Sequence, residues 1–272
     1  MIGGKDRIAA AFSRLRSGGQ KGLITYITAG YPDPGHTLEI LKALADSGSD
    51  LIEIGVPFSD PIADGPVIQR ASHRALEMGI SMKDIFHTAG LFRNYTAIPI
   101  LLMTYYSPVF RAGITEFVNR ARDSGIDGLI VPDLPVEEDG PLRFETARAG
   151  LSLIPLAAPT STEKRIEKIA EKAGGFIYCV AVTGVTGSRK TLGTDLKSFT
   201  DLVKKHTDSP LAVGFGISGP QLASEVAVHC DAVVVGSALV AAVEGGGSPS
   251  SAAGRAGSLA REIKNAINKA GN

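Results

Sequence analysis

Two carboxylates with different surroundings are the first candidates for chemistry in this sequence. Glu53 stands in an apolar, strand-like run between Ile52 and Ile54, and Asp64 follows in a loop rich in Pro and Gly. Burying an ionised carboxylate costs free energy, so we expect Glu53 to be paired, protonated or used in a reaction. Its apolar surroundings should raise its pKa. Two acids whose surroundings separate their pKa values can serve acid/base catalysis.

The alternation of side chains along a strand indicates where Glu53 points. Leu51, Glu53 and Gly55 share one face, and Ile52 and Ile54 share the other. The Ile face suits a covering layer of helices, which turns Glu53 toward the inside of the sheet. A structural ion pair is the alternative, but no predicted strand contains a basic residue that could supply it.

Asp64 is a weaker signal when it is taken alone. An Asp before Gly65 is common in turns. Its place in the loop that follows the Glu53 strand makes it the candidate for the second acid. Asp60, in the same loop, is better explained as a turn residue or a partner contact.

Glycine motifs predict an anion site. Gly214-Phe-Gly-Ile-Ser218 follows one predicted strand, and Val235-Gly-Ser-Ala238 follows the next and opens a short helix. Backbone N–H groups exposed by glycine at a helix start attract phosphate, although either motif alone marks no more than a turn. A third loop, Gly184-Val-Thr-Gly-Ser-Arg-Lys190, has the length and glycine content of a lid, with an ordinary surface loop as the alternative.

The elements that must position these residues alternate between short apolar runs and longer amphipathic segments. Most of the runs are apolar on both faces, as buried parallel strands are. The predicted strands are Leu23–Thr28, Leu51–Gly55, Pro99–Met103, Gly128–Val131, Ser152–Leu156, Phe176–Val180, Leu211–Gly214 and Ala232–Val235. The predicted helices are Met1–Ser17, His36–Asp46, Pro66–Met78, Ser81–Arg93, Ile114–Ser124, Leu142–Ala149, Thr162–Lys172, Asp195–Lys205 and Pro220–Val228.

Eight strand–helix units in about 250 residues predict a closed (β/α)8 barrel of the TIM type. We expect a single domain over residues 1–272, with an extra N-terminal helix, a flexible Gly/Ser-rich connector at 244–257 and a C-terminal helix at 259–269. A doubly wound open sheet is the alternative, but it normally has fewer strands. In a barrel, working residues lie at the C-terminal strand ends, and phosphate binds after strands seven and eight.

Composition excludes several classes of function. Lys plus Arg and Asp plus Glu both number 28, which argues against a nucleic-acid or anionic-membrane surface. The start of the sequence lacks an apolar signal segment, and the longest apolar stretch, 232–243, is too short to span a bilayer. Cys179 and Cys230 lack metal-ligand spacing and are typical of a reduced, cytoplasmic protein without a metal site.

The loop that carries Asp64 also carries a resemblance. The segment Gly-Val-Pro-Phe-Ser-Asp-Pro-Ile-Ala-Asp-Gly-Pro at 55–66, preceded by Glu53, resembles the signature of the tryptophan synthase α chain family. The resemblance extends over nearly the whole sequence. Its further segments are Tyr-Ile-Thr-Ala-Gly-Tyr-Pro-Asp at 26–33, Leu-Met-Thr-Tyr-Tyr-Ser-Pro-Val-Phe at 102–110, Pro-Asp-Leu-Pro-Val-Glu-Glu at 132–138, Thr-Gly-Val-Thr-Gly at 183–187 and Gly-Phe-Gly-Ile-Ser at 214–218.

This resemblance implies a (β/α)8 barrel that cleaves indole-3-glycerol phosphate to indole and glyceraldehyde 3-phosphate, a retro-aldol reaction without a cofactor. It implies that Glu53 and Asp64 are the catalytic acids. The implied substrate contacts are Tyr26, Ile68, Tyr105, Tyr178, Thr186 and Phe215. The implied phosphate contacts are Gly187, Gly216, Gly236 and Ser237.

The resemblance also implies a partner. Family members pair with a pyridoxal-phosphate β subunit in an α2β2 complex, and indole passes to that subunit through a tunnel. Pro57 and Asp60 match positions near the contact. The sequence departs from many relatives at Ala181-Val182, where a Ser-Arg pair is common, and this departure touches the details of the lid.

Three other functions remain open. A different phosphate-binding barrel, such as a sugar-phosphate isomerase, would share the glycine loops but would have no use for the Glu53 and Asp64 pair. A free-standing lyase would release indole without a β partner. An allosteric subunit with weak activity of its own would act mainly by activating its partner.

Overall fold

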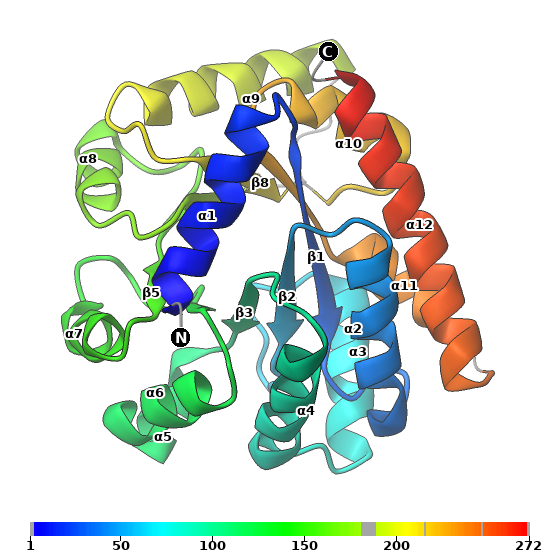
Figure 1. Cartoon of the computed structure of the whole chain (residues 1–272). Helices are drawn as coiled ribbons and strands as arrows, with labels where there is room; N and C mark the ends of the chain where they lie inside the picture. The colour runs from blue at the N-terminus through cyan, green and yellow to red at the C-terminus, as the bar shows by residue number, and fades with distance from the viewer. Residues whose placement is uncertain (1–2, 181–188, 215, 246, 271–272) are drawn as a thin grey trace.

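The protein folds into a ring of parallel strands wrapped by helices (Figure 1). The computed structural model describes residues 3–180, 189–214, 216–245 and 247–270, and of residues 189–194 the helical backbone alone. The strands are β1 Gly22–Thr28, β2 Leu51–Gly55, β3 Ile100–Met103, β4 Gly128–Ile130, β5 Ser152–Ile154, β6 Leu156–Ala157, β7 Ile177–Val180, β8 Leu211–Gly214 and β9 Ala232–Val235.

The strand order confirms the predicted barrel. Neighbouring strands pair in parallel in the order β5-β4-β3-β2-β1-β9-β8-β7-β6. The two ends of this order, β5 and β6, follow one another in the sequence on either side of Pro155, and together they extend one residue beyond the predicted strand Ser152–Leu156. Proline has no N–H to donate to a ladder, but the Pro155 carbonyl still accepts the Tyr178 N–H at 3.0 Å. The backbone itself therefore joins the two ends of the sheet and nearly closes the ring.

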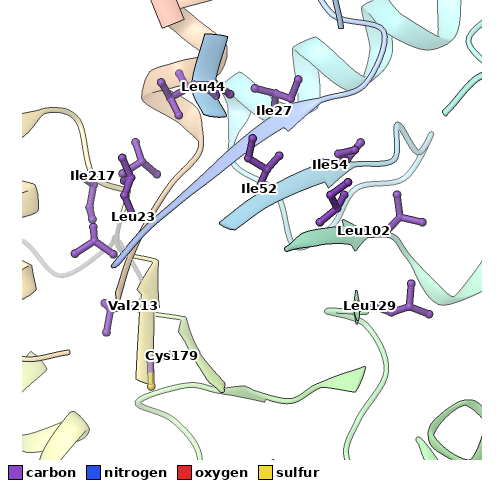
Figure 2. Packing of buried hydrophobic residues seen from close by; sticks show 14 of the residues in the cluster. Leu23, Ile27, Leu44, Ile52, Ile54, Leu102, Leu129, Cys179, Val213 and Ile217 are labelled. Atoms are coloured by element: carbon purple, nitrogen blue, oxygen red, sulfur yellow. The ribbon is translucent and has the colours of Figure 1, made fainter. Parts of the chain in front are cut away.

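The outer faces of the strands pack against a layer of helices, as predicted for Ile52 and Ile54. Both side chains are fully buried in the cluster between strands and helices, and Figure 2 shows them on the outer side of β2. The covering helices are α2 Thr37–Asp46, α3 Pro66–Glu77, α4 Met82–Tyr95, α5 Tyr106–Ala112, α6 Ile114–Asp123, α7 Gly140–Arg148, α8 Glu163–Glu171, α9 Arg189–Lys204, α10 Pro220–Ala227, α11 Ser237–Val243 and α12 Pro249–Ala270. A short 3-10 helix, η1 Pro34–His36, precedes α2.

The N-terminal helix closes one end of the barrel. Helix α1, Gly4–Ser17, places Ile8, Phe12 and Leu15 in one buried cluster with inward-facing strand residues such as Leu51 and Leu101. The amino end of the barrel interior is therefore filled with apolar side chains. Glu53 lies one inward position beyond Leu51, toward the carboxyl end, where a cavity opens into the barrel.

The C-terminal region differs from the prediction. The connector predicted at 244–257 is helical from Pro249 onward, so α12 begins ten residues before the predicted start at 259. Ser248 caps α12, because its hydroxyl oxygen accepts the backbone N–H of Ser251. The alanines in the first turns of α12 favour the helical conformation. The small side chains let α12 pack closely against α2 and α10 (Figure 1). No helix in the described ranges is long and apolar enough to cross a membrane.

Two other helices differ from the prediction. Helix α5 was not predicted, because its seven residues, which include Pro108, are too few to show a helical period. Proline is tolerated in the first helical turn, where its missing N–H has no partner to lose. Helix α9 begins at Arg189 rather than at the predicted Asp195. The organisation of the sequence as a single domain stays a prediction.

Candidate active site

Glu53 lies in the middle of β2, inside the barrel. Its register partners are Tyr26 on β1 and Leu101 on β3. The side chain is fully buried, and neither of its carboxyl oxygens has a hydrogen-bond partner among the described residues. This agrees with the absence of basic residues from the predicted strands. A buried polar group without a partner is rare in folded proteins and needs an explanation.

The surroundings of Glu53 favour its protonated form. Burial raises the pKa of Glu53 to about 8, and the nearby charge of Asp64 adds to the rise. Desolvation penalises the carboxylate, and a neighbouring like charge does the same. Glu53 therefore carries a proton at neutral pH, which is the direction expected from its apolar strand.

Asp64 stands in a wetter position, in the loop between β2 and α3. Its carboxylate is half-buried and accepts a hydrogen bond from the Tyr105 hydroxyl at 3.2 Å. Its backbone carbonyl accepts the side-chain amide of Gln69 at 2.8 Å. Burial raises the pKa of Asp64, and the hydrogen bond from Tyr105 opposes that rise. The two acids thus occupy different environments, as the sequence predicts.

A cavity of about 430 Å³ opens beside both acids. This volume is within the range of small-molecule sites. The cavity is lined mostly by apolar groups and glycines at the carboxyl ends of the strands. Its described lining residues are Tyr26, Glu53, Ala63, Asp64, Gly65, Pro66, Val67, Ile68, Met103, Pro132, Leu156, Tyr178, Val180, Gly214, Gly216, Ile217, Val234, Gly236 and Ser237.

Two tyrosines of the cavity are seated against glycines of neighbouring strands. A Cβ at Gly55 would stand 2.1 Å from the Tyr26 hydroxyl oxygen, and one at Gly214 would stand 2.8 Å from that of Tyr178. The Tyr26 hydroxyl is also 3.3 Å from the Thr28 hydroxyl. Glycine is required at both strand ends because any side chain there would displace a tyrosine from the cavity wall.

The structure brings together most of the residues that the sequence singles out. Glu53, Asp64, Tyr26, Ile68 and Tyr178 lie around the cavity. So do three of the four predicted phosphate contacts, namely Gly216, Gly236 and Ser237. Their individual roles stay predictions. Thr186, Gly187 and Phe215 lie outside the described residues, as does most of the predicted lid at 184–190.

Three other residues singled out from the sequence are not among the described residues that line the cavity. Tyr105 is buried. Pro57 is buried, whereas Asp60 is exposed and accepts a hydrogen bond from the Ser59 hydroxyl at 2.6 Å. Exposure suits a partner contact at Asp60 better than at Pro57.

Sequence reasoning missed several apolar residues of the cavity wall. Met103 and Val234 line it from β3 and β9. Each lies two residues after an inward-facing residue of the apolar cluster that α1 covers. Met103 follows Leu101, and Val234 follows Ala232. Counting this alternation along each strand would have identified both.

The described part of the protein offers no metal centre. Within it, no group of three or more His, Cys, Asp or Glu side chains is arranged to hold a metal ion. The chemistry that the site can support with its own described groups is proton transfer between a neutral carboxyl, a carboxylate and a bound ligand.

Comparison with known proteins identifies a family. The family model described as "Tryptophan synthase alpha chain" matches residues 12–268. The tryptophan synthase alpha chain of Carboxydothermus hydrogenoformans is 49% identical over 239 residues, which are 88% of this chain and 90% of that protein. That of Synechocystis sp. is 45% identical over 263 residues, covering 96% and 99%.

Solved structures agree with the sequence comparisons. A crystal structure of tryptophan synthase subunit alpha from Legionella pneumophila matches with a TM-score of 0.89 and 35% identity, covering 97% of this chain and 98% of that chain. A chain in a crystal structure of tryptophan synthase from M. tuberculosis matches with a TM-score of 0.87 and 32% identity, covering 96% and 99%.

Proposed function

The protein belongs to the tryptophan synthase alpha chain family, and on this premise we propose that Glu53 and Asp64 are its two catalytic acids. It is a lyase that cleaves indole-3-glycerol phosphate to indole in tryptophan biosynthesis. The observation that carries the proposal is the fully buried carboxyl of Glu53, which faces the cavity without a hydrogen-bond partner among the described residues.

Glu53 acts first as the general acid. Indole is a poor leaving group as a carbanion, so the C3 atom of its ring must be protonated before the bond from C3 to the glycerol carbon breaks. Glu53 holds a proton at neutral pH, because its pKa is raised to about 8 by burial and by the charge of Asp64. Transfer of that proton to C3 gives an indolenine, whose ring accepts the electron pair of the breaking bond.

Asp64 stabilises the positive charge that builds on the ring. The indolenine carries this charge at N1, and a carboxylate close to the N1–H favours it or accepts its proton. The hydrogen bond from Tyr105 favours the ionised form of Asp64, because it opposes the rise in pKa that burial causes.

Glu53 then acts as the general base. The carbon that leaves C3 becomes an aldehyde, and its hydroxyl must lose a proton as the bond breaks. The Glu53 carboxylate formed in the first step accepts that proton and returns to its neutral state. The products are indole and glyceraldehyde 3-phosphate, and the enzyme regains its starting protonation.

The phosphate of the substrate binds at the glycine loops after β8 and β9. The support for this proposal is that Gly216, Gly236 and Ser237 line the same cavity as Glu53. Gly187, from the predicted lid, is proposed as a further contact and lies outside the described residues. Ile68, Tyr26 and Tyr178 provide apolar and aromatic surface for the indole ring.

The test of the catalytic assignment replaces each acid by its amide. Glu53→Gln and Asp64→Asn should each lower the rate of indole release by about 10²–10⁴, the usual cost of losing a positioned acid or base. Glu77→Gln, an exposed change at the end of α3, is the matched control and should retain normal turnover. Circular dichroism checks that every variant is folded. A folded Glu53→Gln protein with near-normal turnover would refute the assignment.

We further propose that the protein docks a pyridoxal-phosphate β subunit in an α2β2 complex and passes indole to it. Support comes from the exposed apolar residues Ile62 and Phe110, which are 83% and 68% exposed and follow β2 and β3 at the cavity end of the barrel. Indole release by the protein alone and with a β subunit added separates this proposal from its alternatives. A free-standing lyase would not respond to the β subunit, and a weak allosteric subunit would release little indole alone.

A cytoplasmic location is also part of the proposal. Its support is the pair of free, buried cysteines, Cys179 and Cys230. Burial raises the pKa of both thiols to about 12, which keeps them as unreactive core residues. Recovery of the protein in the cytoplasmic fraction of lysed cells would test this location, and recovery in another fraction would refute it.

A further inference from the structure

The hydroxyl of Tyr105 makes two hydrogen bonds within the loop that carries Asp64. It accepts the backbone N–H of Ala63 at 3.0 Å and donates to Asp64 Oδ2 at 3.2 Å. Donor and acceptor capacity are therefore both used, one on the carboxylate and one on the main chain. The loop follows β2, whereas Tyr105 follows β3, so the contact joins the ends of two neighbouring strands.

Tyr105 is itself held on two sides. Its ring stacks on that of Phe58, from the same loop, with centroids 4.9 Å apart and planes 24° apart. The next residue, Tyr106, donates its backbone N–H to Asp133 Oδ1 at 2.9 Å, and Asp133 follows β4. A lateral series of contacts therefore runs from the Asp64 loop to the ends of β3 and β4. A reacting group works only within a narrow range of geometry, so the residues that position it must themselves be held rigidly.

We propose that Tyr105 is a positioning residue, whose hydroxyl holds the Asp64 carboxylate and the loop around it in the orientation that the reaction needs. The inference rests on the proposed role of Asp64 as the second catalytic acid. It differs from the substrate contact that the family resemblance implies for Tyr105. The side chain is 4% exposed, and its hydroxyl is engaged by the loop rather than directed into the cavity.

The experiment replaces the hydroxyl alone, with Tyr105→Phe. Indole release by the purified protein should show kcat lowered about ten- to a hundredfold, the scale of a misplaced catalytic group. KM should change little, because an interaction made in the transition state is lost rather than one that binds substrate. Tyr106→Phe makes the same chemical change in the next residue and should leave kcat and KM at wild-type values.

The pH profile supplies a readout that simple damage to the fold would not move. The proposed mechanism needs Asp64 ionised, so activity is lost as the pH falls through its pKa. Burial raises that pKa and the Tyr105 hydrogen bond opposes the rise, so Tyr105→Phe should move the acidic limb of the kcat/KM profile to higher pH. Among the described residues, four titratable groups interact electrostatically with Asp64, namely Glu53, Tyr26, Tyr105 and Tyr178. The three tyrosines titrate above their usual range, and Glu53, with a pKa of about 8, governs the alkaline limb, so the acidic limb reports Asp64.

The double variant Tyr105→Phe/Asp64→Asn separates failure of this inference from failure of the proposed function. If Tyr105 acts through Asp64, the double variant should be no slower than Asp64→Asn alone. Near-normal turnover by Asp64→Asn would overturn the proposed catalytic role of Asp64, on which this inference rests. An inactive Asp64→Asn beside a Tyr105→Phe enzyme with unchanged kcat and acidic limb would overturn this inference alone. A higher KM as the sole effect of Tyr105→Phe would also overturn it, in favour of a substrate contact.

Discussion

Two fully buried carboxyls in this barrel have opposite surroundings. Asp127, which precedes β4, is bound by Arg93, by Arg7 from α1 at 2.7 Å and by the Ile100 N–H at 2.7 Å. Glu53 has no such partner among the described residues. A buried carboxylate with ion-pair and hydrogen-bond partners is typical of a structural role, whereas a buried carboxyl without partners and with a raised pKa beside a cavity marks a functional site. Asp127 therefore anchors the N-terminal helix, and Glu53 serves the reaction.

The sequence could predict the second of these residues but not the first. Glu53 is conspicuous because its own strand and the other predicted strands lack a basic residue. The partners of Asp127 are Arg7 and Arg93, on helices that are 120 and 34 residues away in the sequence. Only the folded arrangement brings these three side chains together. Local composition thus indicates an unpaired acid more readily than a paired one.

The raised pKa of Glu53 makes the stability of the fold depend on pH. Its pKa is about 8 in the folded protein, whereas the ordinary value for an unperturbed Glu is 4.5. The folded state therefore binds the proton more tightly, so the contribution of Glu53 is fully present below about pH 4.5. It is lost as the pH rises through the interval up to about 8.

Glu53→Gln removes this loss because an amide stays neutral. We expect the variant to be more stable than the wild type at pH 9, by an amount on the order of a few kcal/mol. The difference should shrink toward pH 5, where the wild-type carboxyl is protonated. Urea unfolding midpoints measured at pH 5, 7 and 9 check this. A difference that is equal at all three pH values would contradict a raised pKa at Glu53.

At the scale of the elements, strands were predicted more closely than helix ends. β2, β8 and β9 have the predicted bounds, because buried parallel strands are continuous apolar runs between polar turns. The start of α12 was missed because its first residues are Gly, Ser and Ala, which also compose flexible connectors. What distinguishes the two cases is packing against α2 and α10, which local composition does not record.

Gly257 provides a test of that packing. A Cβ at this position would stand 2.9 Å from Ser47 Oγ and 3.4 Å from the Ala43 carbonyl oxygen of α2. We expect Gly257→Leu to destabilise the fold by about 1–3 kcal/mol, the usual cost of overpacking. Thermal unfolding measures the change.

Gly254, one turn earlier in α12, is the matched control. It is exposed, and a Cβ there would meet no described atom within 4 Å. Gly254→Leu should therefore raise stability by up to about 1 kcal/mol, because leucine favours helix more than glycine does. Equal destabilisation by both substitutions would show that α12 does not pack on α2 as described.

At the scale of the whole molecule, the two ends of the barrel differ in structure and in function. The amino end is filled by α1 and an apolar layer, whereas the carboxyl end holds the cavity, Glu53 and Asp64. From the order of strands and loops the sequence predicts the location of the working residues at the carboxyl end, but not the filling of the amino end by α1. The sequence cannot predict the hydrogen bond between Tyr105 and Asp64 or the packing of Tyr26 against Gly55. Both contacts depend on how neighbouring strands lie side by side.

The same division predicts where a partner binds. Phe110 follows β3 at the cavity end and is 68% exposed, whereas Val228 follows α10, precedes β9 at the opposite end and is 54% exposed. We expect Phe110→Ser to weaken binding of a β subunit at least tenfold, because exposed aromatic residues commonly anchor interfaces. Val228→Ser, the matched control, should bind normally. Calorimetric titration measures both affinities, and indole release without the β subunit should stay unchanged in each variant. Loss of binding in Val228→Ser alone would move the interface to the closed end of the barrel.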